Sequence, residues 1–178
     1  MRLIHGWNVA GILFLSLFCS YEVRAQTETF YDNANASPLI SFLKSAQKNI
    51  DIEIYEMDDP LVHATIKDAL NRGVKVRVVQ EDSPVGIACK IFDAISGKDA
   101  PDCQNKKKLV STVLKAGGEY VPFKHETLCG TPGSHCFEHG KIVIADHAKA
   151  LISTGNFNST SICNKAENPK NCNRDYTV

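Results

Sequence analysis

CFEHGKIVIAD, residues 136–146, and STGNFNS, residues 153–159, are the two stretches around which the rest of this sequence is arranged. His139 and Lys141 stand two residues apart, so on a β-strand both side chains would project from the same face. The apolar, mostly β-branched residues 142–145 predict that this strand is buried in a sheet. A histidine next to a fixed positive charge indicates a site for a phosphate ester.

The chain before this stretch predicts an alternation of helices and strands. Helices are expected at residues 37–48 and 58–73, because apolar residues recur there at helical spacing. Strands are expected at 50–55 and 74–79, where apolar and polar residues alternate. This strand–helix–strand unit predicts a parallel pair. The expected fold class is α/β, of the α+β sandwich type, with a mixed sheet flanked by helices.

The second half of the chain predicts shorter elements. These are a helix at 85–95, a polar loop at 97–105, a helix at 106–116, strands at 119–121, 141–145 and 150–154, and a strand beginning at 173, inside which the chain stops. Pro122 is expected to end the strand before it. A strand at the very end of the chain leaves an open sheet edge, which a partner or a longer chain would cover.

The first residues, 1–25, have the pattern of a secretory signal peptide, and residues 26–178 are expected to form one domain. Arg2 gives a positive start, and the apolar core of about ten residues that follows is too short to cross a bilayer as a helix. We expect cleavage before Gln26, with an uncleaved membrane anchor as the alternative. The mature chain is then expected to have no stable transmembrane span and to be periplasmic or secreted.

The mature chain would keep six cysteines, an even number that favours disulfides in an exported protein. Six cysteines allow fifteen pairings, and the simplest is sequential. It joins Cys89 to Cys103, Cys129 to Cys136, and Cys163 to Cys172. By the chain-entropy estimate such short loops contribute at most ~2–3 kcal/mol each. None of these cysteines forms a C-x-x-C pattern, so no metal site is expected.

Positive and negative charges are balanced, with 20 basic and 20 acidic residues in the whole chain. Removing the signal peptide removes Arg2, Arg24 and Glu22, which leaves a formal charge of −1. That balance lacks the basic excess usual in a dedicated nucleic-acid binder. The lysine run 106–108 is interpreted as a solvated face at the start of a helix, with a nucleic-acid contact as the alternative.

The pattern H-x-K-x4-D at residues 139–146, followed by G-N-F-N at 155–158, resembles the motif of the phospholipase D superfamily. The resemblance covers residues 37–178 and extends to small one-motif members, among them bacterial endonucleases. The hairpin between Asp146 and Gly155 is two residues longer than the family usually has, and an even insertion keeps each side chain on its face. The family also usually continues with a further strand and helix, which this chain would lack.

The resemblance implies hydrolysis of a phosphodiester without a metal or other cofactor. His139 would attack the phosphorus and form a covalent phosphohistidine. Lys141 and Asn158 would hold the non-bridging oxygens and stabilise the charge of the transition state. Asn156, at a position where the family often has serine, would contribute a weaker phosphate contact.

Three acidic residues have expected places around this site. Asp175 lies where the family places the acidic residue that hydrogen-bonds the histidine and so fixes its tautomer. Asp146 belongs to the catalytic motif and is interpreted chiefly as an anchor for the turn after the strand, with a direct contact to the histidine as the alternative. Glu53 is expected either under the site or in a solvated salt bridge.

One histidine motif supplies only half of this chemistry, because the leaving oxygen needs a proton from an acid on the far side of the phosphorus. The other histidines of the mature chain, none in a second motif, are His63, His125, His135 and His147. We therefore expect a homodimer in which His139 of each subunit faces the other, or a second half that follows Val178 in a longer chain. His135 and His147 are interpreted as surface histidines rather than as parts of a metal cluster.

The expected function is that of a phospholipase D-type phosphodiesterase that hydrolyses phospholipid head groups outside the cytoplasm. The first alternative is a metal-independent secreted or periplasmic endonuclease of the same superfamily, which a basic patch at Lys106–Lys108 and Lys124 would favour. The second alternative is an inactive, truncated binding module. An apolar rim beside His139 would favour a lipid substrate.

Overall fold

The computed structural model describes residues 30–31, 37–82, 84, 89–123, 129, 136–162 and 175–178, and the predicted signal peptide lies outside them. The helices are α1 (Ser37–Ser45), α2 (Pro60–Asn71) and α3 (Pro101–Lys115). The strands are β1 (Phe30–Tyr31), β2 (Asn49–Ile54), β3 (Lys75–Glu81), β4 (Glu119–Phe123), β5 (Lys141–Ala145), β6 (Lys149–Ile152) and β7 (Tyr176–Thr177). Within the described residues, no helix is long and apolar enough to cross a membrane.

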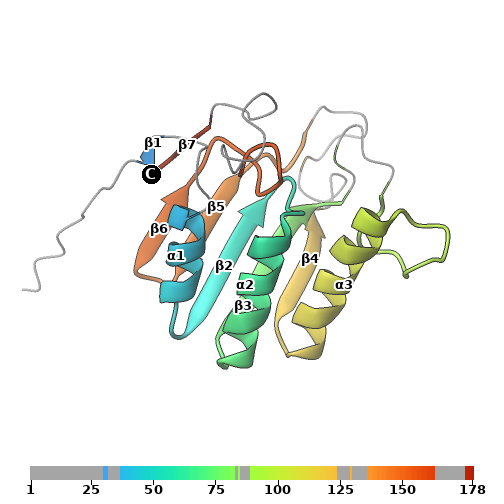
Figure 1. Cartoon of the computed structure of the whole chain (residues 1–178), viewed down its shortest axis with the longest axis horizontal. Helices are drawn as coiled ribbons and strands as arrows, with labels where there is room; N and C mark the ends of the chain where they lie inside the picture. The colour runs from blue at the N-terminus through green and yellow to red at the C-terminus, as the bar shows by residue number, and fades with distance from the viewer. Residues whose placement is uncertain are drawn as a thin grey trace, which may run out of the picture.

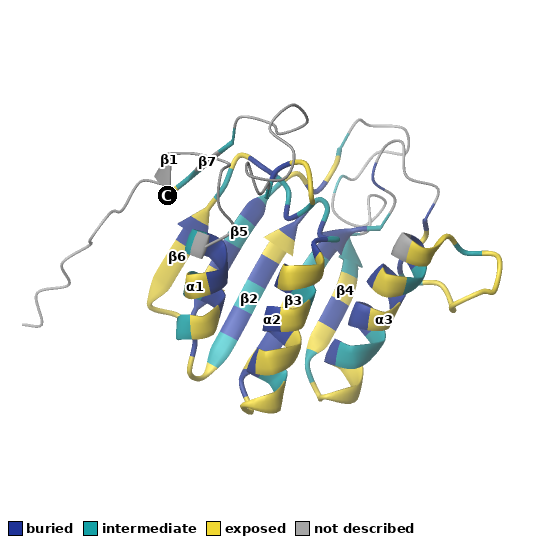
Figure 2. Cartoon of the chain, in the orientation of Figure 1, coloured by how far each residue is buried: buried dark blue, intermediate teal, exposed yellow. Residues whose placement is uncertain are grey.

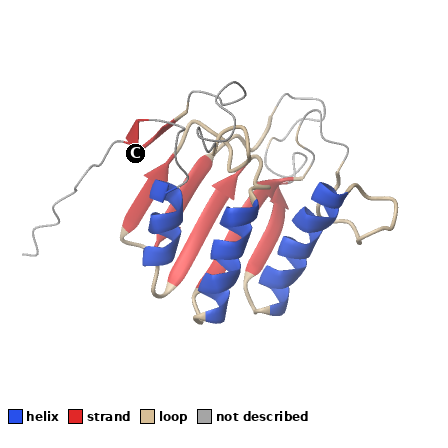
Figure 3. Cartoon of the chain, in the orientation of Figure 1, coloured by secondary structure: helices blue, strands red, loops and turns tan. Residues whose placement is uncertain are grey.

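Five of these strands form one mixed sheet in the order β4-β3-β2-β5-β6 (Figure 3). β2, β3 and β4 run parallel, and Ile50 stands opposite Val76 in the central pair. β5 is antiparallel to β2, and β6 is antiparallel to β5. The predicted parallel pair and the predicted α/β class with a mixed sheet are therefore confirmed.

The three helices lie side by side on one face of the sheet, as Figure 1 shows. The alternation in β2 explains this arrangement, because Ile50, Ile52 and Ile54 are at most 3% exposed and belong to the core under the helices. Burying a side chain of this size contributes about 1.5–3 kcal/mol. The intervening Asp51 and Glu53 lie on the opposite face, and Figure 2 shows the alternation as bands along the strands.

Helix α2 has well-defined ends on both sides. The Oδ1 atom of Asp59 accepts hydrogen bonds from the backbone N–H groups of Leu61 (2.8 Å) and Val62 (3.0 Å), which would otherwise lack partners. Gly73 follows the helix with a φ of 83°, a left-handed conformation that glycine adopts without strain. The start of α2 therefore fixes the short segment that connects it to the end of β2, where the candidate site lies.

The region before α3 differs from the prediction. Residues 89–95, expected to be helical, form turns, and the helix expected from Lys106 begins five residues earlier, at Pro101. Proline is pre-set for the first turn of a helix because its φ is fixed and its missing N–H would be unpaired there anyway. The polar composition of residues 97–105 concealed this start.

Two of the three predicted disulfides are present. Cys89 is joined to Cys103, with Cα atoms 5.6 Å apart, and Cys129 is joined to Cys136, with Cα atoms 6.0 Å apart. The third predicted pair, Cys163 and Cys172, lies outside the described residues. The first bridge ties the turn at residue 89 to the start of α3, and the second ends three residues before His139.

The structure differs from the prediction at the edge strand β4 and at the end of the chain. Pro122 lies inside β4, paired with Gln80, because β4 is an edge strand and proline's missing N–H can face away from the neighbour. The end of the chain is paired: Val178 exchanges two backbone hydrogen bonds of 2.8 Å with Ile152, and β7 is antiparallel to β1.

Candidate active site at one end of the sheet

The C-terminal end of β2 meets the start of β5 and the loop after β6, at the upper end of the sheet in Figure 1. The backbone N–H of Tyr55 donates to the Gly140 carbonyl (3.2 Å), which extends the β2–β5 pairing beyond the strand. The N–H of Phe157 donates to the Glu56 carbonyl, and the N–H of Asp58 donates to the Phe157 carbonyl (both 3.0 Å). Three segments distant in sequence thereby form one surface.

His139 and Lys141 adjoin each other on this surface, although β5 begins at Lys141 and His139 lies just before it rather than on its face. The His139 ring is exposed and packs at a tilt against Tyr55, with ring centroids 4.9 Å apart. Lys141 is only 5% exposed, and its Nζ donates to the His139 carbonyl (2.7 Å). The accessible imidazole therefore has a buried ammonium group beside its own backbone.

The Lys141 ammonium is held in a partly apolar setting. Burial lowers the pKa of Lys141, and the nearby carboxylates of Glu138 and Asp175 oppose that shift. The Nζ atom also lies 5.5 Å from the centre of the Tyr55 ring, within the range of a cation–π contact. The two carboxylates and the aromatic ring favour the charged form of Lys141, against the effect of burial.

Asp175 lies against the turn that follows β6. Its Oδ1 accepts a hydrogen bond from the Thr154 hydroxyl (3.2 Å). A Cβ atom on Gly155 would overlap the Asp175 carboxylate, so the glycine is what allows this close approach. The same carboxylate acts on the Lys141 pKa. Asp175 thus belongs to the same end of the sheet as His139 and Lys141.

The two asparagines of the G-N-F-N turn have different surroundings. The Oδ1 atom of Asn156 is buried and accepts no hydrogen bond among the described residues. Asn158 is fully engaged at its oxygen, which accepts from the Thr160 hydroxyl (2.9 Å) and the Ser161 N–H (3.0 Å). The Asn158 Nδ2 donates to a carboxylate oxygen of Glu56 (2.8 Å).

Asp146 lies at the other end of β5, away from His139. Its carboxylate accepts hydrogen bonds from the backbone N–H groups of Gln47, Lys48 and Asn49 at 2.7–3.1 Å. These bonds hold its pKa below the usual range. The contacts match the anchoring interpretation, and the alternative of a direct contact to His139 is wrong because the whole strand separates the two.

A group of carboxylates surrounds the backbone of His139, and the sequence analysis singled out only one of them, Glu53. The N–H of Glu138 donates to Glu81 Oε2 (3.1 Å), and the N–H of Gly140 donates to Glu138 Oε1 (2.6 Å). Burial raises the pKa of Glu138, and a hydrogen bond with Glu53 raises it further. Glu53 therefore lies under the site, as one of its two interpretations proposed. The E-H-G pattern carried no signal for this, because Glu81 comes from a distant strand.

The lysine run at the start of α3 is not a solvated face. Lys106 and Lys107 are only 5% and 6% exposed, whereas Lys108 is exposed. The Lys106 Nζ lies between Glu56 Oε1 (3.3 Å) and Asp58 Oδ2 (3.2 Å). Two members of the basic patch that would favour nucleic acid are thus withdrawn from the surface, and Lys124 lies outside the described residues.

The remaining described histidines lie elsewhere. His147 is exposed beyond the far end of β5, with Nε2 3.3 Å from Asp51 Oδ2. The ring of His63 bonds to the Met57 carbonyl (3.2 Å), and burial lowers the His63 pKa. Within the described part of the chain, no three His, Cys, Asp or Glu side chains are grouped so that they could hold a metal ion.

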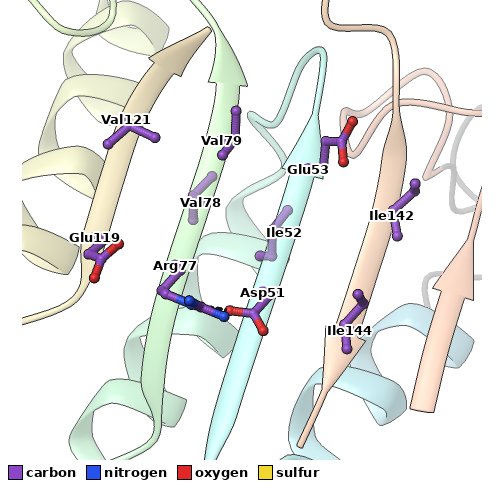
Figure 4. A pocket seen from close by; sticks show the side chains of 10 residues that line it. All are labelled: Asp51, Ile52, Glu53, Arg77, Val78, Val79, Glu119, Val121, Ile142 and Ile144. Atoms are coloured by element: carbon purple, nitrogen blue, oxygen red, sulfur yellow. Dashed lines mark hydrogen bonds and ion pairs between the residues drawn. The ribbon is translucent and has the colours of Figure 1, made fainter. Parts of the chain in front are cut away.

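A hollow of about 270 Å³ lies on the open face of the sheet. Figure 4 shows it crossed by the ion pair between Arg77 and Asp51. The lining residues are Asp51, Ile52, Glu53, Arg77, Val78, Val79, Glu119, Val121, Ile142 and Ile144. Neither His139 nor Lys141 is among them, and Glu53 is the residue that the hollow shares with the candidate site.

Comparison with known proteins identifies the family. A family model described as "Cardiolipin synthase, PLD-like domain" matches residues 39–172. The chain therefore belongs to the phospholipase D-like domain family, within a superfamily of phosphodiesterases. The resemblance noted in the sequence is confirmed.

Solved structures support the fold. A phospholipase D family member, Nuc from Salmonella typhimurium, is similar with a TM-score of 0.57 and 16% identity, over 84% of this chain and 78% of that chain. NucT from Helicobacter pylori is similar with a TM-score of 0.59 and 15% identity, over 84% of this chain and 81% of that chain. No curated protein matches the chain.

Proposed function

We propose that this protein hydrolyses a phosphodiester bond, with His139 as the nucleophile. A ring nitrogen of His139 attacks the phosphorus, the N–P bond forms, and the bond from phosphorus to the leaving oxygen breaks. The leaving oxygen takes a proton from an acid. Water then attacks the phosphohistidine, which releases the phosphate monoester and restores the imidazole. The exposed His139 ring beside the buried Lys141 ammonium is the observation that carries this proposal.

The neighbouring groups have roles in the same proposal. Lys141 stabilises the negative charge on the non-bridging oxygens, and an Asn158 N–H and the Asn156 amide donate to them. The negative charge of Asp175 favours the charged form of Lys141, and its carboxylate orients the His139 ring. Its proximity to Lys141 supports that role.

The proton for the leaving oxygen comes, we propose, from His139 of a second subunit in a homodimer. The described histidines support this, because His63 is bonded to a backbone carbonyl and His147 lies beyond the opposite end of β5. Mixing wild-type protein with an excess of His139→Ala protein and allowing subunits to exchange tests it. Activity should fall below the value given by simple dilution, because mixed dimers lack one of the two imidazoles. Strict proportionality to wild-type protein would contradict the dimeric site.

Two substrate classes fit this chemistry, and a different observation favours each. The exposed Phe137 (41%), two residues from His139, supplies apolar surface next to the nucleophile and favours a phospholipid head group. The similarity in size to Nuc and NucT, of which this chain covers about four fifths, favours nucleic acid. We place the phospholipid first, because the buried Lys106 and Lys107 weaken the basic patch that a polyanion requires.

Export remains part of the proposal. Residues 1–25 act as a signal peptide, and the domain then works in the periplasm or outside the cell. The two disulfides support this, since such bridges form and persist in oxidising compartments.

One experiment separates these alternatives. Purified protein is incubated with EDTA and either phosphatidylcholine vesicles or plasmid DNA, and products are followed by mass spectrometry and gel electrophoresis. Release of choline supports the first substrate, and nicking of DNA alone supports the second. Activity that EDTA abolishes would contradict the histidine mechanism, and a protein inactive on every diester would be the binding module instead.

A further inference from the structure

Lys106 is a buried charge that no part of the proposed reaction uses. It comes from α3, yet its Nζ contacts Glu56 and Asp58, which follow β2 at the candidate site. Burying an ammonium group is costly unless it is paired. Lys106 therefore compensates the negative charges of Glu56 and Asp58 at the end of the sheet.

Glu56 connects this lysine to the turn of the catalytic motif. One carboxylate oxygen, Oε1, lies 3.3 Å from Lys106, and the other, Oε2, accepts from the Asn158 Nδ2 (2.8 Å). The Asn158 oxygen is already occupied by Thr160 and Ser161. The amide oxygen of Asn158 faces two donors and its nitrogen faces an acceptor, so only one orientation of the amide satisfies both. Its second N–H remains for another acceptor.

We propose that Glu56 and Lys106 are positioning residues that aim the second Asn158 N–H at a non-bridging oxygen of the substrate. Glu56 fixes the amide, and Lys106 neutralises Glu56, whose bare negative charge would otherwise repel the phosphoryl group. This inference rests on the proposed function and adds to it a lysine–glutamate–asparagine chain from α3 to the phosphate.

A purely structural role for Lys106 is the competing explanation, and the next residue supplies a control for it. Lys107 is equally buried, and its Nζ donates to Asp99 Oδ2 (2.9 Å) and to the Ala94 carbonyl (3.0 Å). Those partners lie in the loop before α3, not at the candidate site. Lys106→Met and Lys107→Met therefore remove comparable buried charges, and only the first removes the link to Asn158.

The first measurement is steady-state hydrolysis of bis(p-nitrophenyl) phosphate, at a temperature where thermal melts show both variants folded. We expect kcat of Lys106→Met to fall by about 10–100-fold, because a misplaced transition-state donor loses much of its effect. Lys107→Met should keep kcat within about 3-fold of wild type, since its contacts lie outside the site. Equal losses in the two variants would overturn the inference.

A double variant adds a rescue test. When Lys106→Met is combined with Glu56→Gln, the charge next to Asn158 is gone, and the carbonyl of the introduced glutamine can still accept from Asn158, while Asp58 loses its lysine partner as in the single variant. We expect kcat of this double variant to be at least about 5-fold higher than kcat of Lys106→Met. A coupling of that size is usual for residues in contact. An additive loss, with the double variant worse than either single one, would contradict the proposed chain.

A binding measurement keeps the inference testable without turnover. Inorganic phosphate is titrated into each protein while the side-chain amide signals of asparagine are followed by NMR. The Asn158 signals should shift in wild type and in Lys107→Met, and the affinity should fall about 10-fold or more in Lys106→Met. Absence of any phosphate-induced shift in wild type overturns the inference. An inactive protein that shows the expected shifts would overturn the proposed function alone.

Discussion

The two ends of β5 carry the two halves of one sequence motif and have opposite properties. At the His139 end, the imidazole is exposed, the lysine is buried and the neighbouring Glu138 has a raised pKa. At the Asp146 end, three backbone N–H groups satisfy one carboxylate and lower its pKa. The five residues of β5 span about 16 Å at 3.3 Å per residue. The spacing of the motif is thus the length of a strand, with an exposed histidine at one end and an anchoring carboxylate at the other.

The largest effect is expected from His139→Ala. Turnover should fall by about 10⁴-fold or more, because the variant has no nucleophile to form the covalent intermediate. The thermal midpoint should stay close to wild type, since the ring is exposed. His147→Ala, another exposed histidine beyond the opposite end of β5, is the matched control and should retain full turnover. A fully active His139→Ala protein would end the proposed mechanism.

Lys141→Met should come second, with turnover reduced by about 10²–10³-fold, because one charge-stabilising donor is lost. Lys149→Met provides the comparison at the Asp146 end, where the side chain is exposed and no role in the reaction is expected. Both are assayed with the same diester under saturating conditions. If the two lysine variants behave alike, the ends of β5 do not differ in function as described.

Asp146→Ala should act on stability rather than on chemistry. The folded-state pKa of Asp146 is depressed, so its stabilisation is present above the ordinary aspartate pKa of about 3.9 and is lost as pH falls through the folded pKa. We expect a lower Tm at pH 7 and a difference from wild type that shrinks toward pH 2–3. Turnover per folded molecule should change by less than about 3-fold. A large loss of kcat with an unchanged Tm would reverse the assignment.

The smallest effect is expected from Glu138→Gln. The folded-state pKa of Glu138 is raised, so wild type loses stability as pH rises from the ordinary glutamate value of about 4.3 through the folded pKa. The glutamine cannot ionise, yet it can still accept from the Gly140 N–H. Its Tm relative to wild type should therefore rise modestly between pH 4 and pH 8. Glu119→Gln, on the exposed edge strand, is the control, and an equal rise there would remove the contrast.

Much of the sheet was predictable because its strands carry a local signal. Residues 50–55 and 74–79 alternate apolar and polar side chains, and the parallel pair followed from the helix between them. Pro122 misled the prediction for β4, since proline ends a central strand but is tolerated at an edge. Which strand lies at the edge is a property of the whole sheet and not of five residues.

The site was predictable only in part, for a similar reason. The motif brought out His139 and Lys141, but a run of three lysines at the start of a helix looks solvated whatever its surroundings. That Lys106 is buried depends on Glu56 and Asp58, about fifty positions earlier in the chain. The carboxylates around Gly140 likewise come from three separate segments. Neither arrangement leaves a periodic pattern in the sequence.

The contact between Gly155 and Asp175 has a consequence for how this protein can vary. These residues touch, so the chain leaves the sheet after the G-N-F-N turn and returns to the same point. A side chain at position 155 would therefore displace the Asp175 carboxylate, so this position can vary only if Asp175 moves with it.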